Sequence, residues 1–233
     1  MERTVRNEKK NRAEGASKLK IVPFDRWSAA ELERAFDLQE RESAPELTEW
    51  TSVRHPIPEN IFPWVESLRL TLRRMRNYWN EDELRLGFIG PLLYAVNFQG
   101  RGYNFFAGRT LGATINGVKL VGKPDAMVAT GEVRPERPYF FLHEYKRMHV
   151  GSPDPLGQVL AAMLAAQTLN QNGRPVYGCY TVADIWRFVL LYQNSYSVGQ
   201  GYDASDKNEI QIVWSVLCET KKRIEQWAQE ANP

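Results

Sequence analysis

Apolar residues repeat at helical spacing through the first third of the chain. Ser28 and Glu31 form a capping box, which predicts that a helix begins there and covers about residues 29–42. A second helix is predicted over about residues 64–78 and a third over about 81–96. Pro91 lies inside the third pattern, so we expect a kink or break there. Prolines punctuate the segment between the first two helices, which is interpreted as a connection.

The pattern changes to strands after residue 100. Segments at about 103–114, 118–130 and 138–146 are rich in β-branched and aromatic residues, and Asn116-Gly117 between the first two is typical of a hairpin turn. Asp154 and Pro155 then begin a predicted helix that ends near Asn172-Gly173. Two further strands, about 175–182 and 186–192, and a closing helix over about 207–229 complete the pattern.

This order predicts an α/β fold with a mixed sheet flanked by helices. A helix lies between the third and fourth strands, and such a crossover makes these two strands parallel. With 233 residues and 43% hydrophobic content, the chain suits one core, or one core with a small accessory layer. We divide it into an arm of residues 1–22, a helical extension of residues 23–78 and an α/β domain of residues 79–233.

The charge, the cysteines and the lengths of the apolar runs bear on the partners and the compartment to be expected for the protein. The formal net charge of +2 does not by itself indicate a nucleic-acid partner. The arm is basic and polar and is interpreted as flexible, and its alternative is a solvated tail without a partner. Cys179 and Cys218 lack a metal-ligand pattern and are expected to be reduced thiols of a cytoplasmic protein. The chain shows no run of about 18 apolar residues and no signal-peptide pattern, so no membrane partner is expected.

Four arginines are candidates for contact with a phosphate backbone. Arg69, Arg73 and Arg76 form a stripe along the second predicted helix. The alternative for this stripe is an ordinary solvated face. Arg109 lies in the first predicted strand, where its alternative is a structural ion pair.

The most specific chemistry lies in three short pieces of the chain. Asp125 and Glu144 are carboxylates that suit a hard divalent cation. Lys146 follows Glu144 by two residues, so both side chains point to the same face of a strand. Gln158, on the first turn of the next helix, is placed to reach a phosphate or a water. Metal-assisted cleavage of a phosphodiester needs such a set. The alternative is a surface ion pair, Glu144 with Lys146, and a turn residue, Asp125.

The context of these residues resembles the PD-(D/E)xK nuclease superfamily, the fold of many restriction endonucleases. The resemblance covers about residues 79–220. It includes Gly122-Lys123-Pro124-Asp125 before one strand, Tyr139 to Lys146 as the next strand, and Gln158 on the following helix. Upstream, Glu81 to Leu93 looks like the first helix of the nuclease domain in type I restriction subunits.

The resemblance implies a restriction-endonuclease-like α-β-β-β-α-β core and a metal-dependent nuclease that acts on DNA. It implies Mg²⁺, with Mn²⁺ as a substitute, bound by Asp125, Glu144 and a third acid, which is Glu81 or Glu83. Lys146 would then act on the attacking water and Gln158 would position it. A homodimer is an expectation by analogy.

Other functions stay open on the sequence alone. The chain is alternatively a nuclease-fold module that binds nucleic acid or protein without cleaving. It is alternatively a scaffolding protein that docks a partner through its helical extension. A carboxylate-pair hydrolase that acts on sugars is a weaker alternative, because Lys146 has no clear task there.

Overall fold

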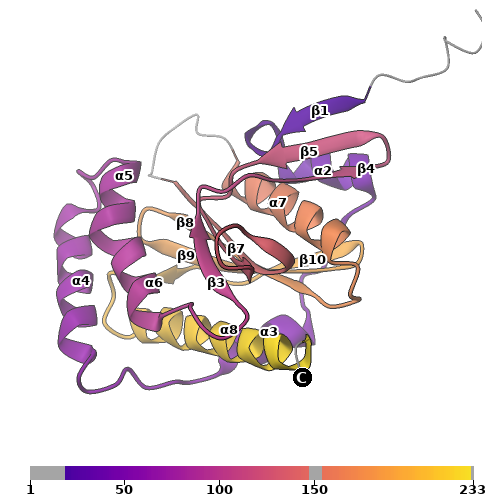
Figure 1. The fold of residues 1–233 in the computed structure, drawn as a ribbon. Coiled ribbons are helices and arrows are strands. Elements are labelled where there is room, and N and C mark those ends of the chain that lie inside the picture. Colours follow the sequence, from indigo (N-terminus) through magenta and orange to yellow (C-terminus); the bar gives the residue numbers. More distant parts are fainter. Residues whose placement is uncertain (1–18, 147–153, 232–233) are drawn as a thin grey trace, which may run out of the picture.

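The computed structural model describes residues 19–146 and 154–231, which form two β-sheets and the helices around them (Figure 1). The larger sheet has the strand order β2-β10-β9-β8-β7-β6-β3, and β11 pairs with β9. The smaller sheet has the order β1-β5-β4. The strands of the larger sheet are β2 (Gln39–Glu40), β3 (Asn104–Ala107), β6 (Ala126–Thr130), β7 (Glu136–Lys146), β8 (Val176–Val182), β9 (Ile185–Tyr192), β10 (Ser195–Val198) and β11 (Tyr202–Asp203). Those of the smaller sheet are β1 (Lys20–Pro23), β4 (Leu111–Ile115) and β5 (Val118–Gly122).

Helices cover both faces of the larger sheet (Figure 1). On one face lie η1 (Phe24–Arg26), α2 (Ala29–Phe36) and α7 (Pro155–Asn170), together with the smaller sheet. On the other face lie α3 (Pro45–Ser52), α4 (Phe62–Met75), α5 (Glu81–Leu84), η2 (Arg85–Ile89), α6 (Gly90–Val96) and α8 (Glu209–Ala231). The mixed α/β class that the sequence pattern predicts is confirmed.

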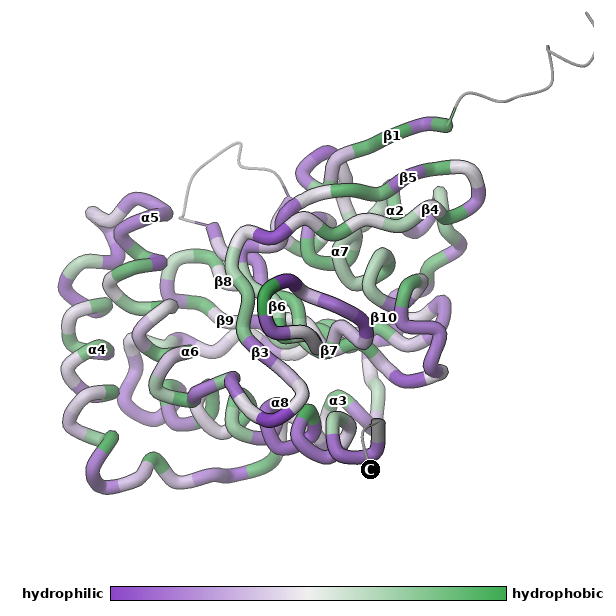
Figure 2. The backbone as a smooth tube through the Cα atoms, viewed as in Figure 1, coloured by the Kyte–Doolittle hydropathy of each residue, from purple (hydrophilic) through white to green (hydrophobic). Residues whose placement is uncertain are grey.

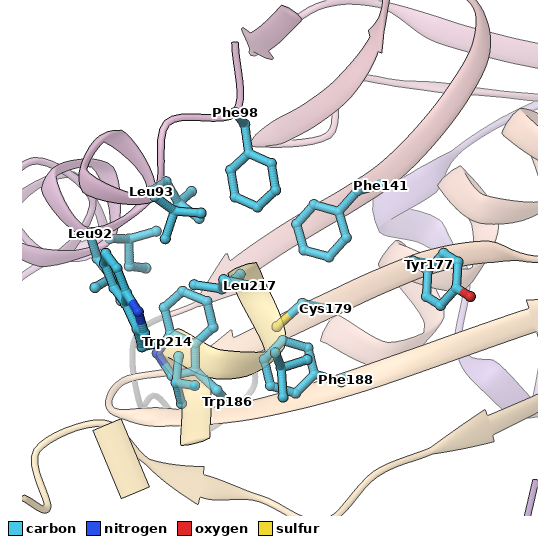
Figure 3. Close-up of a cluster of buried hydrophobic side chains, with 14 of the residues drawn as sticks. Leu92, Leu93, Phe98, Phe141, Tyr177, Cys179, Trp186, Phe188, Trp214 and Leu217 are labelled. Carbon is cyan, nitrogen blue, oxygen red and sulfur yellow. The ribbon is translucent and has the colours of Figure 1, made fainter. Parts of the chain in front are cut away.

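Each face of the sheet has its own hydrophobic core. The core beneath α8 is aromatic and includes Phe141, Trp186, Phe188 and Trp214, which lie close together in Figure 3. The core beneath α7 is aliphatic and includes Leu142, Leu160 and Met163. Figure 2 shows α7 as a largely hydrophobic helix, since it is packed between the larger sheet, the smaller sheet and α2.

The crossover from β7 through α7 to β8 follows the sequence prediction. Strands β7 and β8 are parallel, with Phe141 beside Tyr177 and Lys146 beside Val182. Helix α7 begins as expected, because the Asp154 side chain accepts a hydrogen bond of 3.0 Å from the Leu156 backbone N–H. In this β7–α7–β8 unit, the end of β7 lies close in the sequence to the start of α7.

Two predicted strands are wrong in extent, because each divides between the two sheets. The segment predicted as 103–114 becomes β3 and β4, and the segment predicted as 118–130 becomes β5 and β6. Gly108, with φ of 59°, turns the first segment between the sheets. Pro124 lacks a backbone N–H and lies where the second segment leaves β5, so β-sheet pairing stops there. Asp125 therefore sits at a bend immediately before β6.

The helix predicted over residues 81–96 is continuous but irregular. It consists of α5, a π-helical turn over Arg85–Ile89 and α6. The irregular turn precedes Pro91, which cannot donate the backbone hydrogen bond of a regular helix. The irregularity expected at Pro91 is thus present, displaced toward the N-terminus. Such π turns occur often at functional sites.

Residues 19–75 are packed into the same two cores as the rest of the described chain. Strand β1 begins in the predicted arm of residues 1–22 and ends at Pro23, just beyond it; residues 1–18 of the arm lie outside the described part. Phe24 and Leu32 join the aliphatic core, while Trp50 and Leu72 join the aromatic core. The division near residue 78 therefore does not coincide with a break in packing. Pattern reasoning also missed α3, β2, β10 and β11, which are short or lie in segments interpreted as connections.

A candidate metal and active site at the end of strand β7

The last residues of β7 place charged side chains on one face of the strand and aromatic rings on the other. Leu142 packs in the aliphatic core and Tyr145 in the aromatic core, so alternation puts Glu144 and Lys146 on the side of α7. Strict alternation along β7 would put Phe140 on the face of Glu144, but Phe140 joins the aromatic core, where its ring lies 6.2 Å from that of Trp227. The pairing of β6 with β7 shifts register here, and Phe140 is the residue skipped in that pairing.

Asp125 is tied to β7 at the position next to Glu144. Its Oδ2 accepts a hydrogen bond of 3.0 Å from the backbone N–H of Tyr145. The bend between β5 and β6 makes this contact possible, because Asp125 lies outside both strands and its side chain is free to reach across. The structure therefore brings together the two carboxylates that the sequence singled out.

Glu144 is a buried carboxyl in close contact with charged neighbours. Its side chain is only 2% exposed, and its Oε1 lies 2.9 Å from the Nζ of Lys146. Burial, and next the negative charge of Asp125, raise the pKa of Glu144 to about 8 from an ordinary value of 4.5, although Lys146 opposes the shift. An added cation would favour the ionised form of Glu144.

Lys146 links the carboxylates to the helix α5. Its Nζ lies 3.6 Å from the Oε1 of Glu81. Burial alone lowers the pKa of Lys146, but the carboxylates of Glu144 and Glu81 more than offset this and raise it. The ammonium form of Lys146 is therefore the favoured one.

The two candidates for the third acid have different surroundings. The carboxylate of Glu81 reaches the Nζ of Lys146, at 3.6 Å. The carboxylate of Glu83 instead accepts a 2.7 Å hydrogen bond from the backbone N–H of Asn80 and completes the capping box of α5. Of the two acids, only Glu81 joins the cluster at the end of β7.

Gln158 lies on the first turn of α7, which packs against β7. Its Oε1 is buried without a hydrogen-bond partner, and the Oε1 of Glu144 likewise lacks an aligned hydrogen bond despite its proximity to Lys146. Buried oxygens of this kind are normally satisfied. Both are acceptors, so a cation or a hydrogen-bond donor would satisfy them.

The donor set fits a cation that keeps several of its waters. Within residues 19–146 and 154–231, no three or more His, Cys, Asp or Glu side chains form a metal-binding group. Mg²⁺ often takes only one or two protein carboxylates and completes its shell with water and substrate oxygens. Asp125 and Glu144 match that requirement, and Glu81 does not add a third protein ligand in this arrangement.

His143, next to Glu144, is a core residue. It is fully buried, and its Nε2 lies 2.7 Å from the Oγ1 of Thr181. Burial lowers the pKa of His143 to about 3, so the ring is neutral at physiological pH. Cys179 and Cys218 are both free thiols, as expected.

The predicted arginine stripe on α4 is not an exposed basic face. Arg69 is buried, bonded to Glu66 and to the backbone carbonyl of Ser205, and Arg76 is paired with Asp184. These pairs hold α4 against the β9–β11 region and leave Arg69 no open side for a phosphate. Arg73 is exposed, and Arg109 is exposed in the bend between β3 and β4 rather than in a strand.

Sequence reasoning missed Arg85, which lies beside the cluster. Its pKa is raised by the nearby hydroxyl of Tyr145 and, in smaller part, by the carboxylates of Asp82 and Asp125. Its signal in the sequence is the spacing of four residues from Glu81, which places the two on neighbouring turns of one helix. That spacing alone does not show that the helix faces β7.

No protein-family model matches the chain, and no curated protein sequence matches it. The likeness to the PD-(D/E)xK superfamily therefore remains a prediction from the residues quoted above. Among the described residues, no helix is both long enough and apolar enough to cross a membrane.

Proposed function

We propose that the protein is a divalent-metal-dependent nuclease, with DNA as its substrate and a restriction-endonuclease-like core. The observation that supports this proposal is the meeting of Asp125, Glu144 and Lys146 at the end of β7, with the carboxyl of Glu144 buried and its pKa raised to about 8. Buried charged groups are costly unless a partner is supplied. A bound cation and a phosphate would together supply the missing partners.

The two carboxylates would hold Mg²⁺, with Mn²⁺ as a substitute. When bound, such a cation supplies charge neutralisation at a phosphate and makes a bound water more acidic. Glu144 would release its proton as the site is loaded, because only the carboxylate binds a cation well. The hydrogen bond from the Tyr145 N–H holds Asp125 in place for the same task.

Lys146 and Gln158 would act on the substrate. The raised pKa of Lys146 keeps its ammonium group charged, which suits stabilising the negative charge that grows on phosphate oxygens. It suits proton abstraction poorly, so we assign Lys146 to charge stabilisation and to orienting the water. Gln158, whose Oε1 is buried without a partner, would accept a hydrogen bond from the attacking water. The exposed Arg73 and Arg109 remain proposed contacts to the nucleic-acid backbone.

The test is cleavage of plasmid and of labelled oligonucleotides with Mg²⁺ or Mn²⁺. Glu144→Gln and Lys146→Ala are expected to lower the rate of cleavage by orders of magnitude. Matched controls are Glu136→Gln, an exposed glutamate at the start of the same strand, and Lys222→Ala, an exposed lysine on α8. Cleavage that survives Glu144→Gln, or cleavage that needs no divalent cation, would contradict the proposal.

A second candidate is a nuclease-fold module that binds nucleic acid without cleaving it. It is favoured by the lack, among the residues described, of a third acidic side chain grouped with Asp125 and Glu144 as a metal ligand. Titration calorimetry with Mn²⁺ separates the two functions. Absence of binding heat in the wild-type protein, together with tight nucleic-acid binding, would support the second candidate.

A further inference from the structure

An apolar groove begins beside the proposed active site and runs between α6 and β3. It consists of two adjoining cavities of about 410 and 140 Å³, which share Gly90, Leu93 and Phe105 in their walls. The larger one also contacts Arg85, Tyr145 and Ala126, the residue after Asp125. The groove therefore reaches the residues that directly follow Asp125 and Glu144 in the chain.

The wall of the groove includes apolar side chains that are unusually exposed. Leu86 at the larger cavity is 71% exposed, and Tyr94 at the smaller one is 83% exposed. On the other side, Phe105 and Ala107 belong to β3, the outermost strand at its end of the larger sheet. One end of the groove has a cation at its margin, the half-exposed Arg85, whose guanidinium also pairs with Asp82 at 2.6 Å.

We propose that this groove binds unpaired nucleotides of the substrate strand next to the cleavage position. This inference rests on the proposed function for the placement of the phosphate. Flat rings pack well on Tyr94, Phe105 and Leu86, and base stacking on such side chains is largely independent of sequence. Arg85 supplies the positive charge for a phosphate passing from the groove to the acids.

The chemistry of the groove distinguishes an unpaired strand from a double helix. A duplex presents its phosphates outward and keeps the faces of its bases stacked, so it offers little apolar surface to a protein. An unpaired strand exposes base faces, which match an apolar wall with a cation at one end. The substrate class is therefore nucleic acid with a single-stranded segment, such as a tail, flap or loop.

The experiment measures binding of a labelled single strand and of a blunt duplex by fluorescence anisotropy, at fixed salt and in EDTA to prevent cleavage. The wild-type protein is expected to bind the single strand more tightly. Tyr94→Ala and Leu86→Glu are each expected to weaken that binding about tenfold or more, because stacking is lost or the phosphates are repelled. Tyr192→Ala, a change to an exposed tyrosine on β9, is the matched control and should bind normally.

A parallel cleavage assay in Mg²⁺ uses the same oligonucleotides and separates this inference from the proposed function. If Tyr94→Ala and Leu86→Glu bind the single strand as the wild type does, the groove proposal is overturned, even if Glu144-dependent cleavage is found. Failure of the wild type to bind the single strand, or to prefer it over the duplex, overturns it as well. If the variants lose binding but no cleavage occurs with any substrate, the groove is supported and the nuclease proposal is rejected.

Discussion

His143 and Glu144 are neighbours on β7, both are buried, and burial shifts both pKa values, yet their surroundings differ. His143 faces the aromatic core, where burial lowers its pKa to about 3 and Thr181 is its polar partner. Glu144 faces the other way, where Asp125 and Lys146 meet it and its pKa rises to about 8. A shifted pKa thus reports burial in both cases. Only Glu144 lies among converging charged groups, which is what a catalytic site requires.

The largest expected effect is on cleavage by Glu144→Gln. This change keeps the size of the side chain but removes the charge that binds the cation, so we expect the rate of Mg²⁺-dependent cleavage to fall about a thousandfold. The measurement is the initial rate on a labelled oligonucleotide. A rate within tenfold of the wild type would contradict the assignment of Glu144, and not His143, to the catalytic site.

The same Glu144→Gln variant, although it loses cleavage, is expected to gain thermal stability. The folded-state pKa of Glu144 is raised from 4.5 to about 8, so its stabilising contribution is present below pH 4.5 and is lost as the pH rises toward 8. Without metal, Glu144→Gln should therefore gain thermal stability relative to the wild type between pH 5 and pH 9. Melting curves in EDTA measure this, and parallel curves for the two proteins would contradict it.

His143→Ala should have the reverse profile, with a large loss of stability and an intact catalytic rate. Removal of a fully buried ring leaves a cavity and an unpaired Thr181 hydroxyl, at a cost of about 3 kcal/mol in the free energy of unfolding. Denaturant titration measures the loss. Cleavage per folded molecule, measured at low temperature, should stay within a few-fold of the wild type. A catalytic loss as large as that of Glu144→Gln would show that the two faces of β7 are not functionally separate.

The fourth effect is a loss of stability in acid that depends on His143. Its pKa is lowered from 6.5 to about 3, so the neutral ring stabilises the fold above pH 6.5 and this contribution is lost as the pH falls toward 3. The expected slope is at most about 1.4 kcal/mol per pH unit for one proton. His143→Gln lacks this proton and should show a shallower decline between pH 6.5 and 5. Equal slopes in denaturant titrations would contradict the assignment.

The smallest effect is expected from Thr181→Val, which removes the partner of His143 Nε2. The free energy of unfolding should fall by about 1–2 kcal/mol, because a buried polar nitrogen is left unsatisfied. Thr181→Ser retains the hydroxyl and serves as the control. If Val and Ser substitutions destabilise the protein equally, the hydrogen bond contributes nothing and packing of the methyl group explains the loss.

The sequence was sufficient where the determining contacts lie within a few residues. The capping boxes at Ser28 and Asn80, and the start of α7 at Asp154, depend on a side chain meeting a backbone N–H two or three residues later. The first and the last of these were predicted. Strand alternation likewise placed Glu144 and Lys146 on one face. The parallel pairing of β7 with β8 followed from the helix between them.

Only the tertiary structure decided which distant groups meet. Arg69 bonds to the backbone carbonyl of Ser205, 136 residues away, so one arginine of the predicted basic stripe is a buried contact. The contact of Asp125 with Tyr145 depends on a chain that passes from one sheet to the other at Pro124, and a period-two pattern carries no sign of that change. Glu81 meets Lys146 because the tertiary structure brings the start of α5 to the end of β7. Neighbouring residues determine local periodicity and capping. The convergence of Asp125, Glu81 and Lys146 depends instead on how whole helices and strands pack against one another.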